Sequence, residues 1–247
     1  LTIPQAHVEV ALAAVAAGRH TYSEKPLAVE LPDALRLLEA AEKAGVRVGC
    51  APDTFLGGGH QTARALVDAG AIGIPVGAGS TGMARPTRTI TSEPLKGTIV
   101  AVEVATHVAG TLEFAGGAIV SIAMSFDVAR HRHSPIELYG TEAALQVPDP
   151  NRFGGTVELA RPGGDWEPQP LTHGHAEGNW RILGVADMAA AIREGRPHRA
   201  SGALACHVLE VMLAFQASSD TGRHVTITSR PERPAALPPG RPDGVLD

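Results

Sequence analysis

Hydrophobic positions in the first 70 residues alternate between a helical spacing and short apolar runs. This pattern predicts helices over residues 5–17, 32–44 and 61–69, with strands at residues 21–22 and 46–50 between them. The apolar positions expected to be buried on these helices are Val8, Leu12, Val15, Leu35, Leu38, Ala41, Leu66 and Val67. Helices that alternate with short buried strands are typical of a doubly wound α/β domain.

The pattern changes near residue 97, where apolar residues begin to occupy alternate positions, as in strands with one buried face. Strands are predicted at residues 102–114, 119–126, 136–139, 144–147 and 157–159, with a hairpin turn at Gly116-Gly117. Two helices, over residues 181–194 and 203–218, and a short strand at 225–228 follow. The apolar stripe expected on the second of these helices is Leu204, Val208, Val211 and Phe215.

The predicted fold class is therefore α/β plus α+β. Residues 1–76 are expected to form the later part of a doubly wound (Rossmann) domain. Residues 77–228 are expected to form an open, mostly antiparallel β-sheet domain with flanking helices, which covers the active site and pairs subunits. Residues 229–247 are proline-rich and polar, and they are predicted to be a tail without a core of its own.

The amino-acid composition argues against some classes of binding partner, namely nucleic acids and membranes. The chain has 247 residues, of which 44% are hydrophobic, enough for one large domain or two modest ones. A net charge of −5 without a basic stripe argues against nucleic acid. No run reaches the roughly 18 apolar residues that a membrane span needs, so no membrane partner is predicted. Cys50 and Cys206 form no framework, which fits a reducing compartment such as the cytoplasm.

The triplet Glu24-Lys25-Pro26 is the strongest candidate for chemistry, because it follows the first predicted strand directly. A lysine at the carboxyl end of a parallel strand lies at the crevice where open α/β sheets bind ligands. An ammonium group there can hydrogen-bond a substrate oxygen and help manage the proton that accompanies hydride transfer. Taken alone, Glu24-Lys25 would be read as a solvated ion pair before a proline turn.

The context favours the first interpretation. Thr2-Ile3-Pro4-Gln5-Ala6-His7 opens the helix immediately upstream, and the two segments together resemble the nicotinamide end of the Gfo/Idh/MocA oxidoreductases. Further similar segments, at residues 47–53, 70–73, 184–188 and 195–198, extend the resemblance to about residue 228. The resemblance implies an oxidoreductase that uses NAD or NADP to oxidise or reduce a sugar or polyol-like alcohol by hydride transfer. It also implies a homodimer or homotetramer.

The resemblance assigns roles to individual residues. Lys25 is implied to be the catalytic group that handles the proton and orients the substrate. Pro4, His7, Glu24, Lys25 and Pro26 are implied to surround the nicotinamide. The segment that would discriminate NAD from NADP, after the first helix of such folds, has no counterpart here.

Asp53 and His175 are the candidates for substrate contact. Asp53 ends the second predicted strand at the edge where substrates sit, although an Asp after a proline also suits an ordinary turn. His175 could reach the substrate from the second domain. The segments His173-Gly174-His175 and His131-Arg132-His133 have no companion Cys, Asp or Glu at ligand spacing, so no metal site is predicted.

Two parts of the family pattern have no counterpart in the sequence. No strand, Gly-rich turn and helix for the pyrophosphate precede residue 1. The family's helix that carries an Asp and a His or Tyr also has no match, and an internal deletion is predicted near residues 77–82. The run Gly77 to Gly82 matches G-x-G-x-x-G literally, but we predict an accidental match because the required strand and helix are lacking.

Two hypotheses follow for the function. The first is the NAD(P)-dependent oxidoreductase described above. The alternative is a truncated or degenerate, non-catalytic family member that self-associates through its β-sheet. For the chain as given we expect weak or no binding of NAD(H) and NADP(H), because the pyrophosphate-binding unit has no counterpart in the sequence. An acyl hydrolase is disfavoured, because Ser80 lacks the strand–turn–helix setting of a nucleophile elbow.

Overall fold

The computed structural model of the protein describes residues 2–83 and 104–247, and it divides into two compact units. The first unit comprises residues up to Gln61 together with Asn151–Gly154 and Leu171–Asp247. The second comprises Thr62–Pro150, as far as it is described, and Gly155–Pro170. The predicted boundary at residue 76 stays a prediction.

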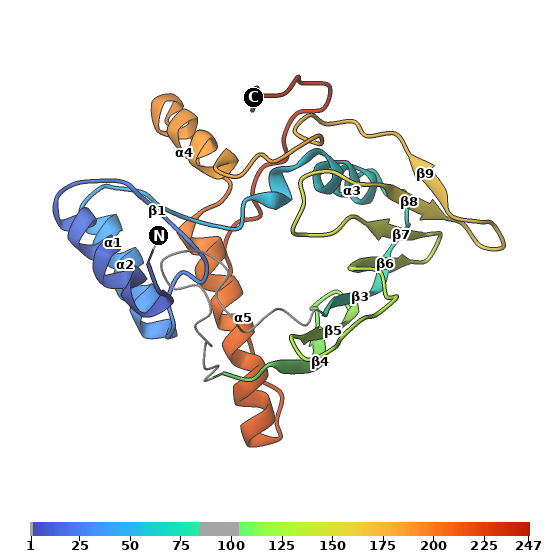
Figure 1. Ribbon diagram of the computed structural model, residues 1–247, viewed down its shortest axis with the longest axis horizontal. Coiled ribbons are helices and arrows are strands. Elements are labelled where there is room, and N and C mark those ends of the chain that lie inside the picture. The colour runs from blue at the N-terminus through green and yellow to red at the C-terminus, as the bar shows by residue number, and fades with distance from the viewer. Residues whose placement is uncertain (1, 84–103) are drawn as a thin grey trace. The chain divides into compact units, whose positions relative to one another are not determined.

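The first unit contains a two-stranded parallel sheet with helices packed on it (Figure 1). Its elements are η1 (Pro4–Ala6), α1 (His7–Ala16), β1 (Thr21–Ser23), α2 (Leu31–Lys43), β2 (Val48–Cys50), η2 (Thr54–Leu56), the start of α3 (Gly58–Asp68), α4 (Leu183–Glu194) and α5 (Gly202–Thr221). The alternation of helix and strand up to α3 agrees with the sequence prediction. β1 and β2 pair in register with Tyr22 opposite Gly49.

The core of the first unit is built from α1, α2, β2 and α5, with Leu27 and Ala28 added from the segment after β1. The predicted burial of Leu35 is wrong, because its side chain is 53% exposed. The buried stripe of α2 is centred instead on Leu37 and Ala41, which places Leu35 on the solvent side.

On α5 the apolar stripe is also displaced from the predicted one. Val208 is 47% exposed, whereas Cys206 and Leu209 reach the core. Both cysteines are free and buried, and burial raises the pKa of the Cys50 thiol to about 11. By length and composition α5 could cross a membrane, with a mean hydropathy of 1.2 over 18 residues, which differs from the sequence prediction. One such helix is weak evidence for a membrane, because a core helix passes the same test.

Residues 229–247 contain no helix or strand, and the strand predicted at 225–228 is absent. The segment is nevertheless packed. Leu237 and Leu246 are buried with residues of η2, α4 and the 151–154 segment in a second cluster, whose buried members are Leu56, Phe153, Leu183, Leu237 and Leu246. The predicted tail therefore contributes to the core of the first unit.

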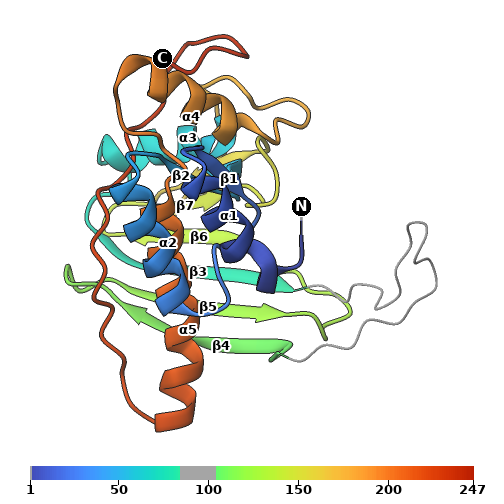
Figure 2. The same ribbon diagram turned by 90° about the vertical axis from the view of Figure 1, so that its left-hand side faces the viewer.

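The second unit is built on a seven-stranded sheet in the order β4-β5-β3-β6-β7-β8-β9 (Figure 2). The strands are β3 (Pro75–Met83), β4 (His107–Glu113), β5 (Ile119–Ser125), β6 (Ile136–Gly140), β7 (Ala144–Val147), β8 (Val157–Ala160) and β9 (Glu167–Gln169). Among the strands that the structure describes in this sheet, β3 and β5 alone pair in parallel, so the sheet is mostly antiparallel, as predicted. The predicted strand residue Val102 lies outside the described residues.

One face of this sheet packs against α3. Leu145, Val147, Val157 and Leu159 are buried there with Ala63 and Ile72, and Leu66 and Val67 pack against them as predicted. The G-x-G-x-x-G run lies within β3, which is bonded to β5 on one side and to β6 on the other. The backbone N–H groups of β3 therefore serve the sheet and do not form a phosphate-binding turn, which confirms that the match is accidental.

Candidate active site at the end of the parallel sheet

The turn Glu24-Lys25-Pro26 begins where β1 ends and is fixed on both sides. The strand β1 precedes the turn in the chain, and the fully buried Leu27 and Ala28 follow it and anchor it in the core. The Lys25–Pro26 peptide bond is cis, as is Ala51–Pro52 at the end of the neighbouring strand. Lys25 itself is exposed, so its side chain extends from a fixed turn.

Glu24 supports the turn through the backbone. Its carboxylate accepts a hydrogen bond of 3.3 Å from the backbone N–H of Lys25. Its own carbonyl oxygen accepts a contact of 3.5 Å from the Cys50 thiol, which ties the turn to the end of β2. The role of Glu24 in the structure is therefore to shape the loop that presents Lys25.

His7 joins the two segments on which the sequence resemblance rests. Its ring is 5% exposed, and Nδ1 lies 2.8 Å from the carbonyl oxygen of Pro26. Nε2 lies 3.2 Å from the carbonyl oxygen of Thr2. A residue at the start of α1 thus holds the turn that carries Lys25, while Pro4 lies in the exposed η1 just before it.

A cavity of about 540 Å³ opens beside this turn, entirely within the first unit. Its size is typical of sites for small molecules. Three predicted site residues line it, namely His7, Glu24 and Asp53. The other lining residues are Thr2, Val10, Ala11, Ala14, Thr21, Tyr22, Ser23, Ala51, Arg181, Ile182 and Val185.

Asp53 is 4% exposed and has a structural bond as well as a place in the cavity wall. Its Oδ2 accepts a hydrogen bond of 2.9 Å from the backbone N–H of Gly184, in the first turn of α4. A carboxylate at this position satisfies an otherwise free donor and interacts favourably with the helix dipole. Asp53 therefore fixes the start of α4 next to the cavity.

Tyr22 is the residue of this site that the sequence prediction did not single out. Its ring lies over Gly49, where an added Cβ would come within 2.5 Å of the ring, and its hydroxyl lies against Gly184. Burial, and then the charge of Asp53, raise the pKa of the Tyr22 phenol. Two glycines on different elements are thus required to accommodate one aromatic side chain.

A signal for this feature was present in the sequence. Thr21-Tyr22-Ser23 places three hydroxyl groups in a strand where a buried parallel strand is usually apolar. In the structure the oxygens Thr21 Oγ1 and Tyr22 Oη are buried without a hydrogen-bond partner among the described residues. Ser23 Oγ also lacks an oxygen or nitrogen partner, although it lies beside the Cys50 thiol.

His175 does not line the cavity. Its side chain is 2% exposed, and Nε2 accepts a hydrogen bond of 2.8 Å from the backbone N–H of Gly244. The neighbouring His173 is also buried, and its Nε2 lies 3.0 Å from the carbonyl oxygen of Leu237. Both histidines hold the 229–247 segment. The described residues contain no group of three or more His, Cys, Asp or Glu side chains that could hold a metal ion.

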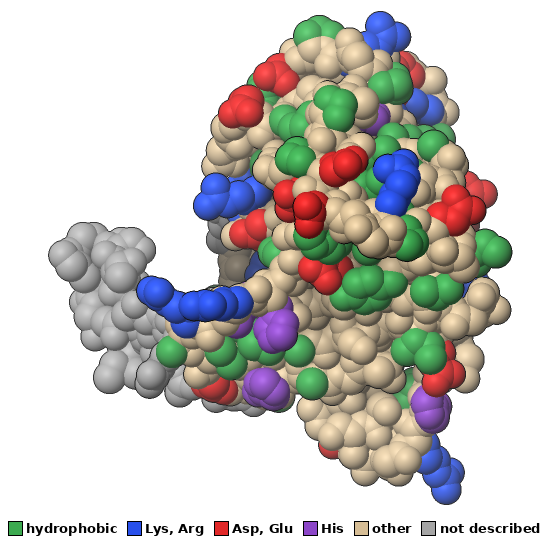
Figure 3. Space-filling model, turned by 90° about the vertical axis from the view of Figure 1, so that its right-hand side faces the viewer, with side chains coloured by type: hydrophobic (Ala, Val, Ile, Leu, Met, Phe, Trp, Pro, Cys, Tyr) green, Lys and Arg blue, Asp and Glu red, His purple; other side chains and the backbone are tan. Residues whose placement is uncertain are grey.

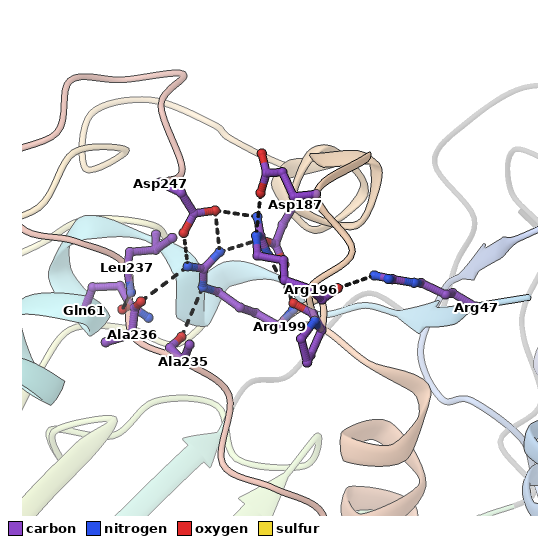
Figure 4. A network of polar contacts seen from close by, with 11 residues as sticks. Arg47, Gln61, Asp187, Arg196, Arg199, Ala235, Ala236, Leu237 and Asp247 are labelled. Carbon is purple, nitrogen blue, oxygen red and sulfur yellow. Dashed lines mark hydrogen bonds and ion pairs between the residues drawn. The ribbon is translucent and has the colours of Figure 1, made fainter. Parts of the chain in front are cut away.

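A buried ion network stabilises the wall of the site behind α4 (Figure 4). Asp187 on α4 is fully buried and pairs with Arg199 at 2.5 Å and with Arg196 at 3.0 Å. Both arginines also contact Asp247. The carbonyl oxygen of Arg196 accepts a hydrogen bond of 2.6 Å from Arg47, which precedes β2. The network links α4, the turn after it and the 229–247 segment.

Comparison with known proteins identifies a family model and curated relatives that match part of the chain. Residues 1–51 match the model of the oxidoreductase family with an NAD-binding Rossmann fold, GFO_IDH_MocA. A 1,5-anhydro-D-fructose reductase from Ensifer adhaerens is 39% identical over 77 residues, which cover 31% of this chain and 23% of the reductase. An inositol 2-dehydrogenase from Saccharopolyspora erythraea is 42% identical over 76 residues, or 28% and 21% of the two chains. The aligned region thus spans about a quarter of these relatives.

Solved structures extend the likeness to nearly the whole chain. An NAD-binding oxidoreductase from Klebsiella pneumoniae has a TM-score of 0.75 at 22% identity, with 93% of this chain and 79% of that chain covered. The aldose-aldose oxidoreductase from Caulobacter crescentus, solved with glycerol, has a TM-score of 0.75 at 18% identity and coverages of 92% and 77%. At these identities the likeness establishes the fold. The predicted fold class is therefore confirmed by the likeness in fold over most of the chain. The resemblance to the Gfo/Idh/MocA oxidoreductases is confirmed by sequence over residues 1–51.

Proposed function

We propose that the protein is an oxidoreductase that uses NAD or NADP to transfer a hydride to or from a sugar or polyol-like alcohol. The observation that carries the proposal is the contact of 2.8 Å between His7 Nδ1 and the carbonyl oxygen of Pro26. It joins the two segments of the family pattern into one fixed turn beside a cavity. Proteins that are similar to part of this chain include an anhydrofructose reductase and an inositol dehydrogenase.

In this proposal Lys25 is the catalytic residue. Oxidation of an alcohol moves a hydride from carbon to the nicotinamide and releases the hydroxyl proton as the carbonyl forms. The side chain of Lys25 hydrogen-bonds the substrate oxygen and helps manage that proton in both directions. Lys25 is exposed on a turn anchored by buried neighbours and does not itself line the cavity, so the proposal requires its side chain to turn toward a substrate bound there.

The residues present fit the nicotinamide end of the cofactor. His7 and Glu24 line the cavity, and Pro4 and Pro26 lie in the segments that frame it. The cofactor supplies the hydride acceptor or donor when bound. Asp53 serves as a substrate-binding residue in this proposal, since it lines the same cavity. His175 acts on the site from a distance, because it holds the 229–247 segment.

We further propose a homodimer or homotetramer, active in the cytoplasm, that pairs through the sheet of the second unit. One face of β4 and β5 carries the exposed Ala109, Thr111 and Ser121 at alternate positions, with the exposed, larger Ile119 on the same face. Small side chains allow another sheet to approach closely, and two-fold pairing of like surfaces is the commonest way to build an oligomer. Figure 3 views the side on which β9 lies in Figure 1, where hydrophobic side chains are interspersed with polar atoms.

The test is an enzyme assay in which the protein is mixed with NAD+ or NADP+ and with one candidate substrate at a time. Formation of NADH or NADPH is followed by absorbance, and the candidate substrates are myo-inositol, levoglucosan, L-sorbose and glycerol. Turnover with at least one pair would support the proposal, and in an enzyme that turns over, Lys25→Ala should lower kcat about a hundredfold or more. Cofactor affinity should change much less, because the pyrophosphate in such folds is held by a Gly-rich turn and not by this lysine. Lys43→Ala, which removes an exposed lysine on α2, is the matched control and should leave kcat unchanged.

Two results would contradict the proposal. A kcat of Lys25→Ala within about threefold of wild type would show that Lys25 does not handle the proton. Absence of turnover with both cofactors across the panel, together with no binding of NADH or NADPH by titration calorimetry, would favour the non-catalytic alternative.

A further inference from the structure

The 229–247 segment, hereafter the strap, is held in place by side chains instead of by secondary structure. Glu210 on α5 accepts hydrogen bonds from the backbone N–H groups of Thr228 and Ser229. Gln61 accepts one from the backbone N–H of Leu237 at 2.9 Å. Arg199 donates to the carbonyl oxygen of Ala235 at 3.1 Å. Arg196 and Arg199 also pair with the carboxylate of Asp247 at the end of the strap. A segment that is held by side chains and has no helix or strand of its own can open separately from the elements it lies on.

Among these bonds, the one formed by His175 depends on the protonation state of its side chain. Its Nε2 accepts the backbone N–H of Gly244, and therefore that nitrogen must be unprotonated. Its backbone N–H donates to Asp243 at 2.5 Å, and its carbonyl oxygen accepts from the backbone N–H of Gly58. The ring packs edge-on against Trp180, with 4.9 Å between the ring centroids.

Protonation would change this contact from attraction to repulsion. The imidazolium carries a hydrogen on both nitrogens, so Nε2–H would point at the N–H of Gly244. The ring is 2% exposed, so the new charge would also be poorly solvated. Asp243 is the charged group that faces it, whereas Trp180 and the backbone of Gly58 are uncharged.

His173 provides an internal contrast. Its Nε2 faces the carbonyl oxygen of Leu237, and its Nδ1 faces the hydroxyl of Thr172. A hydroxyl can accept as well as donate, so a doubly protonated His173 would keep both partners. Of the two buried histidines that hold the strap, only His175 loses a bond on protonation.

We propose that the strap is a pH-sensitive latch, closed by neutral His175 and released by its protonation in mild acid. Release exposes the cluster that Leu237 and Leu246 complete with Leu183, the first residue of α4. Because residues 181, 182 and 185 line the cavity, loosening of this turn loosens one wall of the site. The proposal concerns the fold and does not depend on the proposed activity.

The pH range follows from the sign of the shift. Burial lowers the pKa of His175 from its ordinary value near 6.5, and the Asp243 carboxylate opposes that shift. A histidine with a lowered pKa in the folded state contributes stability that is present above pH 6.5 and is lost as the pH falls through the folded value. The latch should therefore be closed at pH 7.5 and should open on acidification below pH 6.

Hydrogen exchange measured by mass spectrometry tests the latch on residues 1–247, with protection factors corrected for the intrinsic pH dependence of exchange. We expect protection of residues 244–247 to fall at least about tenfold between pH 7.5 and pH 5, reversibly, while α2 and β2 keep theirs. His175→Gln retains an uncharged acceptor and should remove the pH dependence. His173→Gln and the exposed His224→Gln should leave it as in wild type.

Asp243→Asn is a second variant that does not alter the ring. Because the Asp243 charge favours the imidazolium, its removal should move release to lower pH. The latch is refuted if wild-type protection is the same at both pH values, if His175→Gln is as pH-sensitive as wild type, or if Asp243→Asn moves release to higher pH. The wild-type and Asp243→Asn measurements decide the matter even if His175→Gln fails to fold.

Discussion

The buried pair of Asp187 and Arg199 permits the sharpest prediction of stability. Asp187 is fully buried on α4, and the Arg199 side chain is 4% exposed. Three donors converge on this carboxylate: Arg199 Nη1 at 2.5 Å, the backbone N–H of Arg199 at 2.6 Å and Arg196 Nη1 at 3.0 Å. The substitution Asp187→Ala removes the acceptor of all three donors.

The expected loss is large because the partner charge stays buried. Removing one member of a buried ion pair costs about 3–5 kcal/mol, since the remaining charge is left without compensation. Arg199 retains Asp247 and two backbone carbonyls, which places the estimate toward the lower end of about 3–5 kcal/mol. A domain has a total stability of about 5–15 kcal/mol, so Asp187→Ala should sharply reduce the urea midpoint of the first unit.

Two further variants separate charge from packing. Glu39→Ala breaks the pair of Glu39 with Lys43, whose side chains are 65% and 73% exposed, and should leave the urea midpoint nearly unchanged. The double variant Asp187→Leu with Arg199→Met removes both charges together and should recover part of the loss of Asp187→Ala, because an apolar replacement of a buried pair is often tolerated.

The measurement is urea unfolding followed by the fluorescence of Trp180, in a Trp166→Phe background. Trp180 packs against the cluster of the first unit, whereas Trp166 belongs to the second unit. The signal therefore reports on the unit that contains the pair. A loss below about 1 kcal/mol for Asp187→Ala, or a double variant less stable than the single one, would refute the assignment of the energy to an uncompensated charge.

Two other predictions follow from the same structure. Hydrogen bonds from Ser229 and Thr228 lower the pKa of Glu210 from 4.5 to about 2, so this carboxylate contributes stability that is present above pH 4.5 and lost as the pH falls toward 2. Glu210→Gln should flatten the decline of the thermal midpoint across that range, and an unchanged decline would contradict the assignment. For the proposed oligomer, light scattering at tens of micromolar should give a defined dimer or tetramer that Thr111→Arg weakens, and a monodisperse wild-type monomer would refute it.

The regular elements could be predicted because each is specified by local periodicity. The helices over 7–16, 31–43 and 202–221 and the strands at 136–140 and 144–147 agree with the predicted ranges to within a few residues. The buried face of each helix was less predictable than its range in the sequence. Leu35 was placed on the buried side, but the helix turns that face outward because α2 packs through Ala34, Leu37 and Ala41.

Some features of the candidate site could likewise be predicted from the sequence, and others could not. The turn at Lys25 could be located because its tripeptide lies at the end of a strand, and His7 could be associated with it through the resemblance. The slot that holds Tyr22 could not be predicted, because it is formed by Gly49 and Gly184, which are far apart in sequence. The bond from Asp53 to the N–H of Gly184 depends on the same long-range contact.

The strap shows why a segment without periodicity can still be ordered. Its composition, rich in proline and polar residues, predicts a tail, because it cannot bury enough apolar surface by itself. The structure supplies the missing interactions from elsewhere: Arg199, Gln61 and His175 bond its backbone. Of these partners only His175 changes its charge in mild acid, because Gln61 is neutral and the guanidinium of Arg199 stays protonated. In the proposed latch, a change of pH therefore reaches the first turn of α4 through His175 alone, without any change in the core of α1 and α2.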